Sequence, residues 1–199
     1  FLNIYQNIVK DPQSASIDIL SEKYSENITN INLSYELTNF VPRKGKLKKQ
    51  KTNTNSSNKS QRRSQESRKV GLSGEDHVYE YEYNRLTKSG HSDLADKIRK
   101  HCELGETPGW DITSFNEDGT EKFIEVKSTK GKTINDFDFT PNEWRAASEE
   151  RNKYYVYLVI RALSNDRKII EVINNPYKKV EDGQIKIETS QYNLDLRTL

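Results

Sequence analysis

The sequence predicts an α/β domain in which a mixed central sheet is flanked by helices. From residue 71 onward the expected elements follow in the order helix, strand, strand, helix, strand, strand. The stretch KYYVYLVIRAL at 153–163 is β-branched and aromatic, and it is too apolar for an exposed strand, so we place it at the centre of the sheet. RKIIEVINNP at 167–176 is its expected hairpin partner, ended by a proline.

Three helix-forming stretches are expected in this domain. The first spans roughly residues 74–88, with Ser73 as its N-cap. The second runs near residues 93–102 and leads into a Pro-Gly pair. The third begins at TPNE, where Thr140 caps the helix, the proline suits the first turn and Glu143 completes a capping box.

The part of the chain before residue 71 has a different composition. Residues 43–70 carry eleven Lys or Arg and the single acid Glu66, a net charge of +10, whereas the remainder of the chain sums to −8. These residues hold little apolar surface, so we expect a disordered basic linker, acting either as a tether for nucleic-acid phosphates or as a plain soluble spacer. Residues 1–42 are interpreted as the remnant of an upstream region of unknown function, with INLSYELTNFV as a strand or edge segment.

Several classes of function are excluded by composition. The single cysteine, Cys102, allows no disulfide within the chain and fits a reducing compartment. One cysteine beside one histidine cannot build a four-ligand zinc site, and no glycine-rich phosphate loop is present. No apolar run approaches the length of a membrane span. We therefore expect a cytoplasmic protein without membrane contact, and the absence of Met leads us to interpret the chain as a fragment of a longer protein.

The segment GWDITSFNEDGTEKFIEVKS at 109–128 predicts a hairpin with charged residues at unusual positions. Side chains alternate between the two faces of a strand. On the second arm Ile124 and Val126 therefore share one face, and Glu125 and Lys127 share the other. Charges consequently fall where a half-buried strand should carry apolar side chains.

The first arm adds an acid to the same face. If Trp110 and Ile112 join the apolar face, Asp111 lies on the face of Glu125. A three-residue turn at 117–119, with glycine at positive φ, is a common hairpin solution. It sets Asp111 directly opposite Glu125, with about 4.5–5.5 Å between their Cα atoms.

Two opposed carboxylates repel each other, so something must offset the repulsion. Mg²⁺ is a suitable candidate because it takes oxygen ligands and needs only one or two carboxylates beside water and a substrate phosphate; Mn²⁺ is the expected substitute. Lys127 would then hold an attacking water or stabilise charge on a phosphate. The same pattern is also typical of a simple ion pair between Lys127 and a neighbouring acid.

These motifs carry a resemblance to a known family. GWDI followed by FIEVKST resembles the PD-(D/E)xK nuclease superfamily, although Trp110 stands where the superfamily has proline. More narrowly, residues from about 71 to 177 resemble the DUF3883 domain at the C-terminus of NO VEIN-type proteins, through GEDHVYEYE, GWDITS, FIEVKST, FDFTPNEW, YYVYLV and INNP. The resemblance implies a restriction-endonuclease-like core within residues 71–199.

The resemblance also implies roles for single residues. Asp111 and Glu125 become metal ligands and Lys127 becomes the catalytic lysine. The superfamily often adds an acid from the preceding helix, a position that Glu75 occupies here; the alternative role for Glu75 is a favourable interaction with the helix dipole. Glu80 and Glu82 are the next candidates for that acid. The basic candidates for nucleic-acid contact are Lys130 and Lys132, after the second arm, and Arg62 and Arg63, in the linker.

Together these observations lead us to expect a Mg²⁺-dependent DNA endonuclease domain of a multidomain restriction, antiviral defence or repair protein. Residues 71–199 carry 24 acids and 19 Lys or Arg, so DNA affinity must come from the basic linker or from the missing upstream domain. The alternative is a catalytically silent nuclease fold that docks nucleic acid or protein. RNA as the substrate and assembly into a homodimer are left open.

Overall fold

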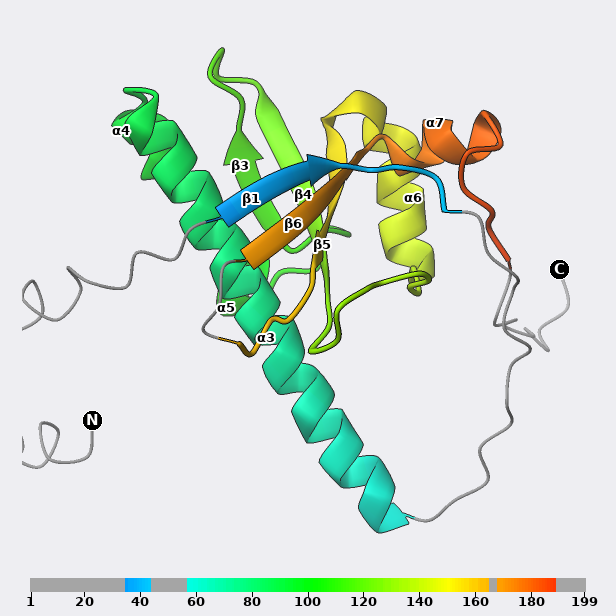
Figure 1. The fold of residues 1–199 in the computed structure, drawn as a ribbon. Helices are drawn as coiled ribbons and strands as arrows, with labels where there is room; N and C mark the ends of the chain where they lie inside the picture. The colour runs from blue at the N-terminus through cyan, green and yellow to red at the C-terminus, as the bar shows by residue number, and fades with distance from the viewer. Residues whose placement is uncertain (1–34, 44–56, 165–167, 189–199) are drawn as a thin grey trace, which may run out of the picture. The chain divides into compact units, whose positions relative to one another are not determined.

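The computed structural model of the chain describes residues 35–43, 57–164 and 168–188, and the side chains of 57–64 and 168–169 are outside this description (Figure 1). The described residues form a mixed six-stranded sheet in the order β1-β6-β5-β4-β3-β2. Helices flank this sheet, which confirms the predicted α/β class. The strands are β1 Tyr35–Asn39, β2 Arg99–Lys100, β3 Ile112–Phe115, β4 Glu121–Ser128, β5 Tyr154–Val159 and β6 Lys168–Asn174. The helices are α3 Ser57–Lys88, α4 Ser92–Ala95, α5 His101–Leu104, α6 Pro141–Glu150 and α7 Pro176–Glu181, with a 3₁₀ turn at Arg151–Lys153.

The predicted hairpin is present as β3 and β4. Its register pairs Ile112 with Ile124 and Phe115 with Glu121. The turn has the three-residue form expected from the sequence, because the amide of Asn116 donates to the carbonyl of Thr120 at 2.8 Å. Gly119 has φ of 83°, a conformation that glycine adopts without steric cost.

The centre of the sheet also agrees with the sequence. β5 lies between β4, to which it is parallel, and β6, to which it is antiparallel. The capping box that was predicted from TPNE starts the crossover helix α6: the Thr140 hydroxyl accepts from the Glu143 amide, and the Glu143 carboxylate accepts from the Thr140 amide. α7, which follows β6, was not predicted.

The first described strand corrects the predicted domain boundary. Residues 35–39 were assigned to an upstream remnant, yet they form β1, which pairs in parallel with β6 at the edge of the sheet. The Tyr35 hydroxyl donates to the Glu80 carboxylate at 2.5 Å, and the Tyr35 ring packs against Tyr81 at 6.0 Å between centroids. These contacts make β1 part of the folded domain. Residues 1–34 lie outside the described part of the chain.

Helix α3 corrects two further predictions. It begins at Ser57, so Ser73 is not its N-cap, and residues 57–70 are helical and not disordered. Ser73 instead donates from its hydroxyl to the carbonyl of Ala162 at 2.8 Å. The physical reason is that Lys, Arg and Gln are good helix formers, and that turns added to a packed helix avoid the cost of nucleation. Residues 44–56 of the predicted linker lie outside the described residues.

The single helix expected near residues 93–102 is also wrong. α4 ends at Ala95, a two-residue strand β2 follows, and α5 begins at His101. β2 pairs Lys100 with Ile112 and so extends the sheet beyond β3. Residues 99–100 form a strand and not a helix because the strand provides hydrogen-bond partners for the backbone groups on the open edge of β3.

Two apolar cores lie on the two faces of the sheet. One core joins α3 to one face and contains Val78, Leu86, Ile112, Ile124 and Val126. The other joins α6 to the opposite face and contains Phe123, Ala146 and Tyr154. Figure 1 shows α3 and α6 on different sides of β4 and β5. Within the described part of the chain, no helix is long and apolar enough to cross a membrane.

A buried charge network fixes α3 to the sheet. Glu82 is fully buried, and its carboxylate accepts from Lys122 at 3.0 Å and from the Tyr157 hydroxyl at 2.7 Å. Arg85 at 2.6 Å and Ser114 at 2.8 Å donate to its other oxygen. Burial opposes the charge of Glu82, but the cations of Lys122 and Arg85 outweigh it and keep the pKa of Glu82 below its ordinary value.

Glu82→Ala should destabilise the fold strongly, because it leaves the buried Lys122 ammonium without its carboxylate. We expect a loss of about 3–5 kcal/mol in urea unfolding. The double variant Glu82→Leu, Lys122→Met should recover most of that loss, since it removes both charges. Equal loss in the single and double variants would contradict the ion-pair account.

Candidate active site at the junction of β3 and β4

Glu125 and Lys127 project from the face of β4 that is covered by α6. Phe123, on the same face, belongs to the α6 core, as the alternation of the strand requires. The Glu125 side chain is buried, with 4% exposure. Its Oε1 lies 2.7 Å from Nζ of Lys127. The predicted Glu-x-Lys pair therefore forms on one face of the sheet.

Asp111 lies at the point where β3 begins, beside this pair. The strand ladder ends at Ile112 and Ile124, one pair before the predicted pairing of Asp111 with Glu125. Instead, the Asp111 amide donates to the Ile124 carbonyl at 3.0 Å, and its carbonyl accepts from the amide of His101 at 2.9 Å. Its carboxylate accepts from the amide of Val126 at 2.8 Å. Asp111 is thus held by its backbone on two sides and by its side chain on a third.

The prediction for Trp110 is wrong, and the reason is local. Trp110 was expected on the face of Ile112, but its ring stacks on Phe123 at 4.2 Å between centroids. Its indole N–H donates to the Thr113 hydroxyl at 2.8 Å. Gly109, with φ of 108°, breaks the extended backbone just before Trp110, so strict alternation does not reach it.

Glu143 is a site residue that the sequence identified only as a helix cap. Lys127 donates to Oε2 of Glu143 at 2.8 Å, so its ammonium bridges two carboxylates. The same Glu143 oxygen accepts from the Thr140 amide at 3.1 Å. The capping box therefore fixes Glu143, and Glu143 in turn fixes Lys127. The sequence signal FTPNEW pointed to the helix start and not to this contact.

Glu75 reaches the site from α3. The neighbouring Gly74 packs against the end of β4, where an added Cβ would lie 2.5 Å from Cβ of Ser128. This close approach brings the turn of α3 that follows Gly74 to the C-terminal end of β4. Glu75 accepts a hydrogen bond from the Cys102 thiol at 2.9 Å, and its charge helps to raise the pKa of Asp111.

The two central carboxyl groups titrate abnormally. Burial raises the pKa of Asp111 to about 6, assisted by the Glu75 charge and opposed by the Val126 amide. Burial, followed by the Asp111 charge, raises the pKa of Glu125 to about 9. Lys127 behaves in the opposite way: burial opposes its charge, but Glu125 and Glu143 hold the pKa of Lys127 above its ordinary value. The site thus concentrates more negative charge than its one ammonium neutralises.

The donor set fits a hard divalent cation. Asp111 and Glu125 offer carboxylate oxygens, which Mg²⁺ prefers, and their raised pKa values indicate that a further positive charge is favoured there. Across the described ranges, no group of three or more His, Cys, Asp and Glu side chains is arranged to hold a metal ion. Two carboxylates are nevertheless sufficient for Mg²⁺ when water and phosphate complete its shell.

The other predicted residues are distributed as follows. Glu80 binds Tyr35 and Glu82 lies in the buried network on the α3 face, so neither replaces Glu75. Lys130 is exposed and pairs with Glu66 at 2.5 Å, and Lys132 is also exposed. Arg62 and Arg63 belong to α3, but their side chains are outside the described part.

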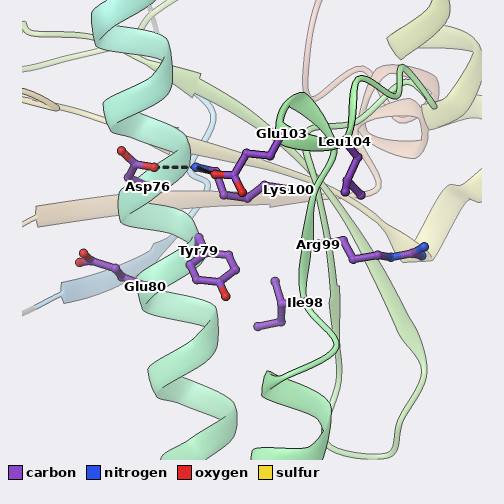
Figure 2. Close-up of a pocket in the computed structure, with 8 residues that line it drawn as sticks. All are labelled: Asp76, Tyr79, Glu80, Ile98, Arg99, Lys100, Glu103 and Leu104. Carbon is purple, nitrogen blue, oxygen red and sulfur yellow. Dashed lines mark hydrogen bonds and ion pairs between the residues drawn. The ribbon is translucent and has the colours of Figure 1, made fainter. Parts of the chain in front are cut away.

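A surface hollow near the site has a different character. Figure 2 shows it between α3 and the β2–α5 segment, with Lys100 held by Asp76 at 2.6 Å and by Glu103 at 2.9 Å. Its other lining residues are Tyr79, Glu80, Ile98, Arg99 and Leu104. Asp111, Glu125 and Lys127 are not among them, so the candidate site does not coincide with this hollow.

Comparisons with known proteins place the domain among relatives. A family model described as "Protein NO VEIN, C-terminal" matches residues 74–173. Protein NO VEIN of Arabidopsis thaliana is 26% identical over 122 residues, which are 61% of this chain and 4% of that protein. Protein NO VEIN-LIKE of Arabidopsis thaliana is 27% identical over 117 residues, 59% of this chain and 17% of that protein. The chain spans a small part of these relatives' length, and no solved structure matches it.

The titration of Glu125 predicts a pH-dependent stability difference. Its folded pKa of about 9 lies above the ordinary value of 4.5, so ionisation progressively destabilises the fold as pH rises between these values. In metal-free buffer, Glu125→Gln should match the wild type in melting temperature near pH 4 and exceed it increasingly toward pH 9. A difference that shrinks as pH rises would contradict this assignment.

Gly74→Ala should test the packing that brings Glu75 to the site. The added methyl overlaps Ser128, so we expect a loss of about 1–3 kcal/mol of unfolding free energy despite the better helix propensity of alanine. Adding Ser128→Gly should recover part of it by removing the overlapping atoms. Gly71→Ala is the matched control, since open space surrounds that position.

Proposed function

The chain belongs to the family of NO VEIN C-terminal domains, and from this premise we propose that its folded domain is a Mg²⁺-dependent nuclease that hydrolyses phosphodiester bonds in DNA. The observation that carries the proposal is the convergence of Asp111, which directly precedes β3, with Glu125 and Lys127 of β4 at one end of the hairpin. Their resemblance to the PD-(D/E)xK pattern supports the same chemistry. Restriction, antiviral defence or repair is the setting that this resemblance predicts.

In the proposed mechanism Asp111 and Glu125 would hold the metal ion. When bound, Mg²⁺ would polarise the scissile phosphate and favour hydroxide formation from water near neutral pH. The Val126 amide holds the Asp111 carboxylate toward the edge of β4, so this ligand needs little rearrangement. Burial, and after it the neighbouring negative charges, raises the pKa values of both acids, and a bound cation would favour their ionised forms.

Lys127 would supply the mobile positive charge of the site. Its ammonium has three N–H donors; it donates to Glu125 and Glu143 and lies 5.4 Å from the centroid of the Phe139 ring. A metal ligand role for Glu125 would release one of these bonds and leave Glu143 to position Lys127. The ammonium could then hold the attacking water or stabilise negative charge on the phosphate. Glu143 is therefore a positioning residue in this proposal.

Glu75 of α3 would act beside Asp111, whose pKa its charge helps to raise after burial. Its carboxylate is half-buried and is held by the Cys102 thiol. It could orient water around the metal ion, which usually keeps several waters when it is Mg²⁺. This role is secondary to that of the two ligands, so its loss should weaken activity less than theirs.

A second function, docking without catalysis, is favoured by one observation. In the described segments no three His, Cys, Asp or Glu side chains are arranged to hold a metal ion, and Lys127 fills the space beside Glu125. A silent nuclease fold would keep such an ion pair for stability alone. The two functions make different predictions. A nuclease needs Asp111, Glu125 and Lys127 for metal-dependent cleavage of DNA, whereas a docking module does not cleave DNA.

Cleavage of supercoiled plasmid in Mg²⁺ or Mn²⁺ tests the proposal. Asp111→Asn, Glu125→Gln and Lys127→Ala should each lower the rate at least about 100-fold, because each removes a group that acts on the transition state. Glu121→Gln is the matched control, an acid on the same strand and face, and should retain full activity. Cleavage that is unchanged in all three variants, or absent from the wild type with either metal, would contradict nuclease activity.

A further inference from the structure

Helix α3 connects the candidate site to a basic segment without a break. It runs continuously from Ser57 to Lys88 and carries Glu75 in its middle. Figure 1 shows its first turns extending beyond the sheet. Residues 57–70 hold five Lys or Arg and one acid, Glu66, whereas residues 71–199 are net acidic. The positive charge of the sequence therefore lies on the N-terminal part of the same helix that carries Glu75.

Two contacts fix this extension relative to the catalytic strand. The Ser128 hydroxyl at the end of β4 donates to the Val70 carbonyl at 2.9 Å. Lys130, in the loop that follows β4, pairs with Glu66 at 2.5 Å. Lys127, the proposed catalytic lysine, lies one residue before Ser128 on the same strand. The base of the extension is therefore in direct contact with the end of β4 and with the loop that follows it.

Helix geometry places one exposed cation, Arg68, in line with the site. Arg68 precedes Glu75 by seven residues, which is close to two turns, so both lie on nearly the same side of α3 and about 10 Å apart along its axis. Measured along the axis of a DNA duplex, this distance is about the rise of three phosphates of one strand. Arg68 and Lys69 are both exposed.

We infer that residues 57–70 of α3, together with Lys130 and Lys132, form a phosphate-binding arm that holds duplex DNA across the site. The inference rests on the proposed function, because it names how that site would hold its substrate. The acidic remainder of the domain repels phosphates, so binding must concentrate on the arm. Glu66 limits the affinity of the arm, since it neutralises Lys130 in the free protein.

The composition of the arm selects a duplex over other anionic partners. Single-stranded nucleic acid is usually held by aromatic side chains that stack on bases, and residues 57–70 contain no aromatic residue. A helix that binds a membrane surface needs a broad apolar face, but the one apolar residue of this segment, Val70, is buried against the domain. A basic segment that neither stacks on bases nor inserts an apolar face into lipid is suited to binding the phosphate backbone of a DNA duplex.

The test measures binding separately from cleavage. The full chain carrying Asp111→Asn and Glu125→Gln, in metal-free buffer, is titrated into a labelled DNA duplex and followed by fluorescence anisotropy. Adding Arg68→Ala and Lys69→Ala should weaken binding about tenfold and lower the slope of log K against log salt by about 1.8, the value for two lost phosphate contacts. Lys88→Ala with Lys97→Ala, near the other end of α3, removes the same charge and should change little.

Glu66→Gln should change duplex affinity in the opposite direction to the alanine variants. A gain of affinity cannot result from simple misfolding. It releases Lys130 and removes a negative charge from the arm, so duplex binding should become tighter. Weaker duplex binding by Glu66→Gln would contradict the proposed arm. An equal loss of duplex affinity in the Arg68→Ala, Lys69→Ala variant and in the Lys88→Ala, Lys97→Ala variant would also contradict it. So would equal affinity for the single strand, or equally arm-dependent binding to vesicles of anionic lipid. If the duplex binds through the arm but the unmodified chain does not cleave it, the phosphate-binding arm is supported and only the nuclease activity is rejected.

Discussion

The requirement that every buried charge find a partner governs how the two faces of β4 are covered. Lys122 lies on one face and meets Glu82 of α3, while Glu125 and Lys127 lie on the other, where Lys127 pairs with Glu125 and with Glu143 of α6. An unpaired charge at any of these depths would cost several kcal/mol, so each helix can occupy only the face that supplies its partner. The two networks therefore position both helices around a single strand. In one network a single carboxylate, Glu82, is held by two cations, whereas in the other a single cation, Lys127, is held by two acids beside further acidic groups; that difference separates a structural cluster from a candidate site.

The candidate site arises where regular structure ends. β3 begins at Ile112, and the carboxylate of the preceding residue, Asp111, accepts a hydrogen bond from the Val126 amide. The close contact of Gly74 with Ser128 then brings α3 to the same edge, with Glu75 beside Asp111. Four separate elements, β3, β4, α3 and α6, thus contribute charged groups to one small region. Burial and mutual repulsion of the acids follow directly from that convergence.

The sequence predicted the features that depend on short-range rules. The turn at Gly119, the alternation along β4, the capping box at Thr140 and the central position of β5 all follow from local geometry. It failed where tertiary contacts decide. The 57–70 segment looked disordered because helix growth from the packed half of α3 is not visible in composition. Trp110 left its expected face because Gly109 ends the extended backbone. The partnership of Glu143 with Lys127 joins residues 16 apart on different elements, and no local pattern encodes it.

We propose that Asp111 and Glu125 bind a divalent cation, and calorimetric titration of Mn²⁺ into the full chain tests this proposal most directly. Saturable binding to the wild type, kept by Glu121→Gln and lost in the Asp111→Asn, Glu125→Gln double variant, is the predicted result. All three proteins must show cooperative thermal unfolding, so that loss of binding reflects loss of ligands. Binding of equal affinity in the double variant, or none in the wild type, would contradict the account and leave the buried acids as a structural ion-pair cluster.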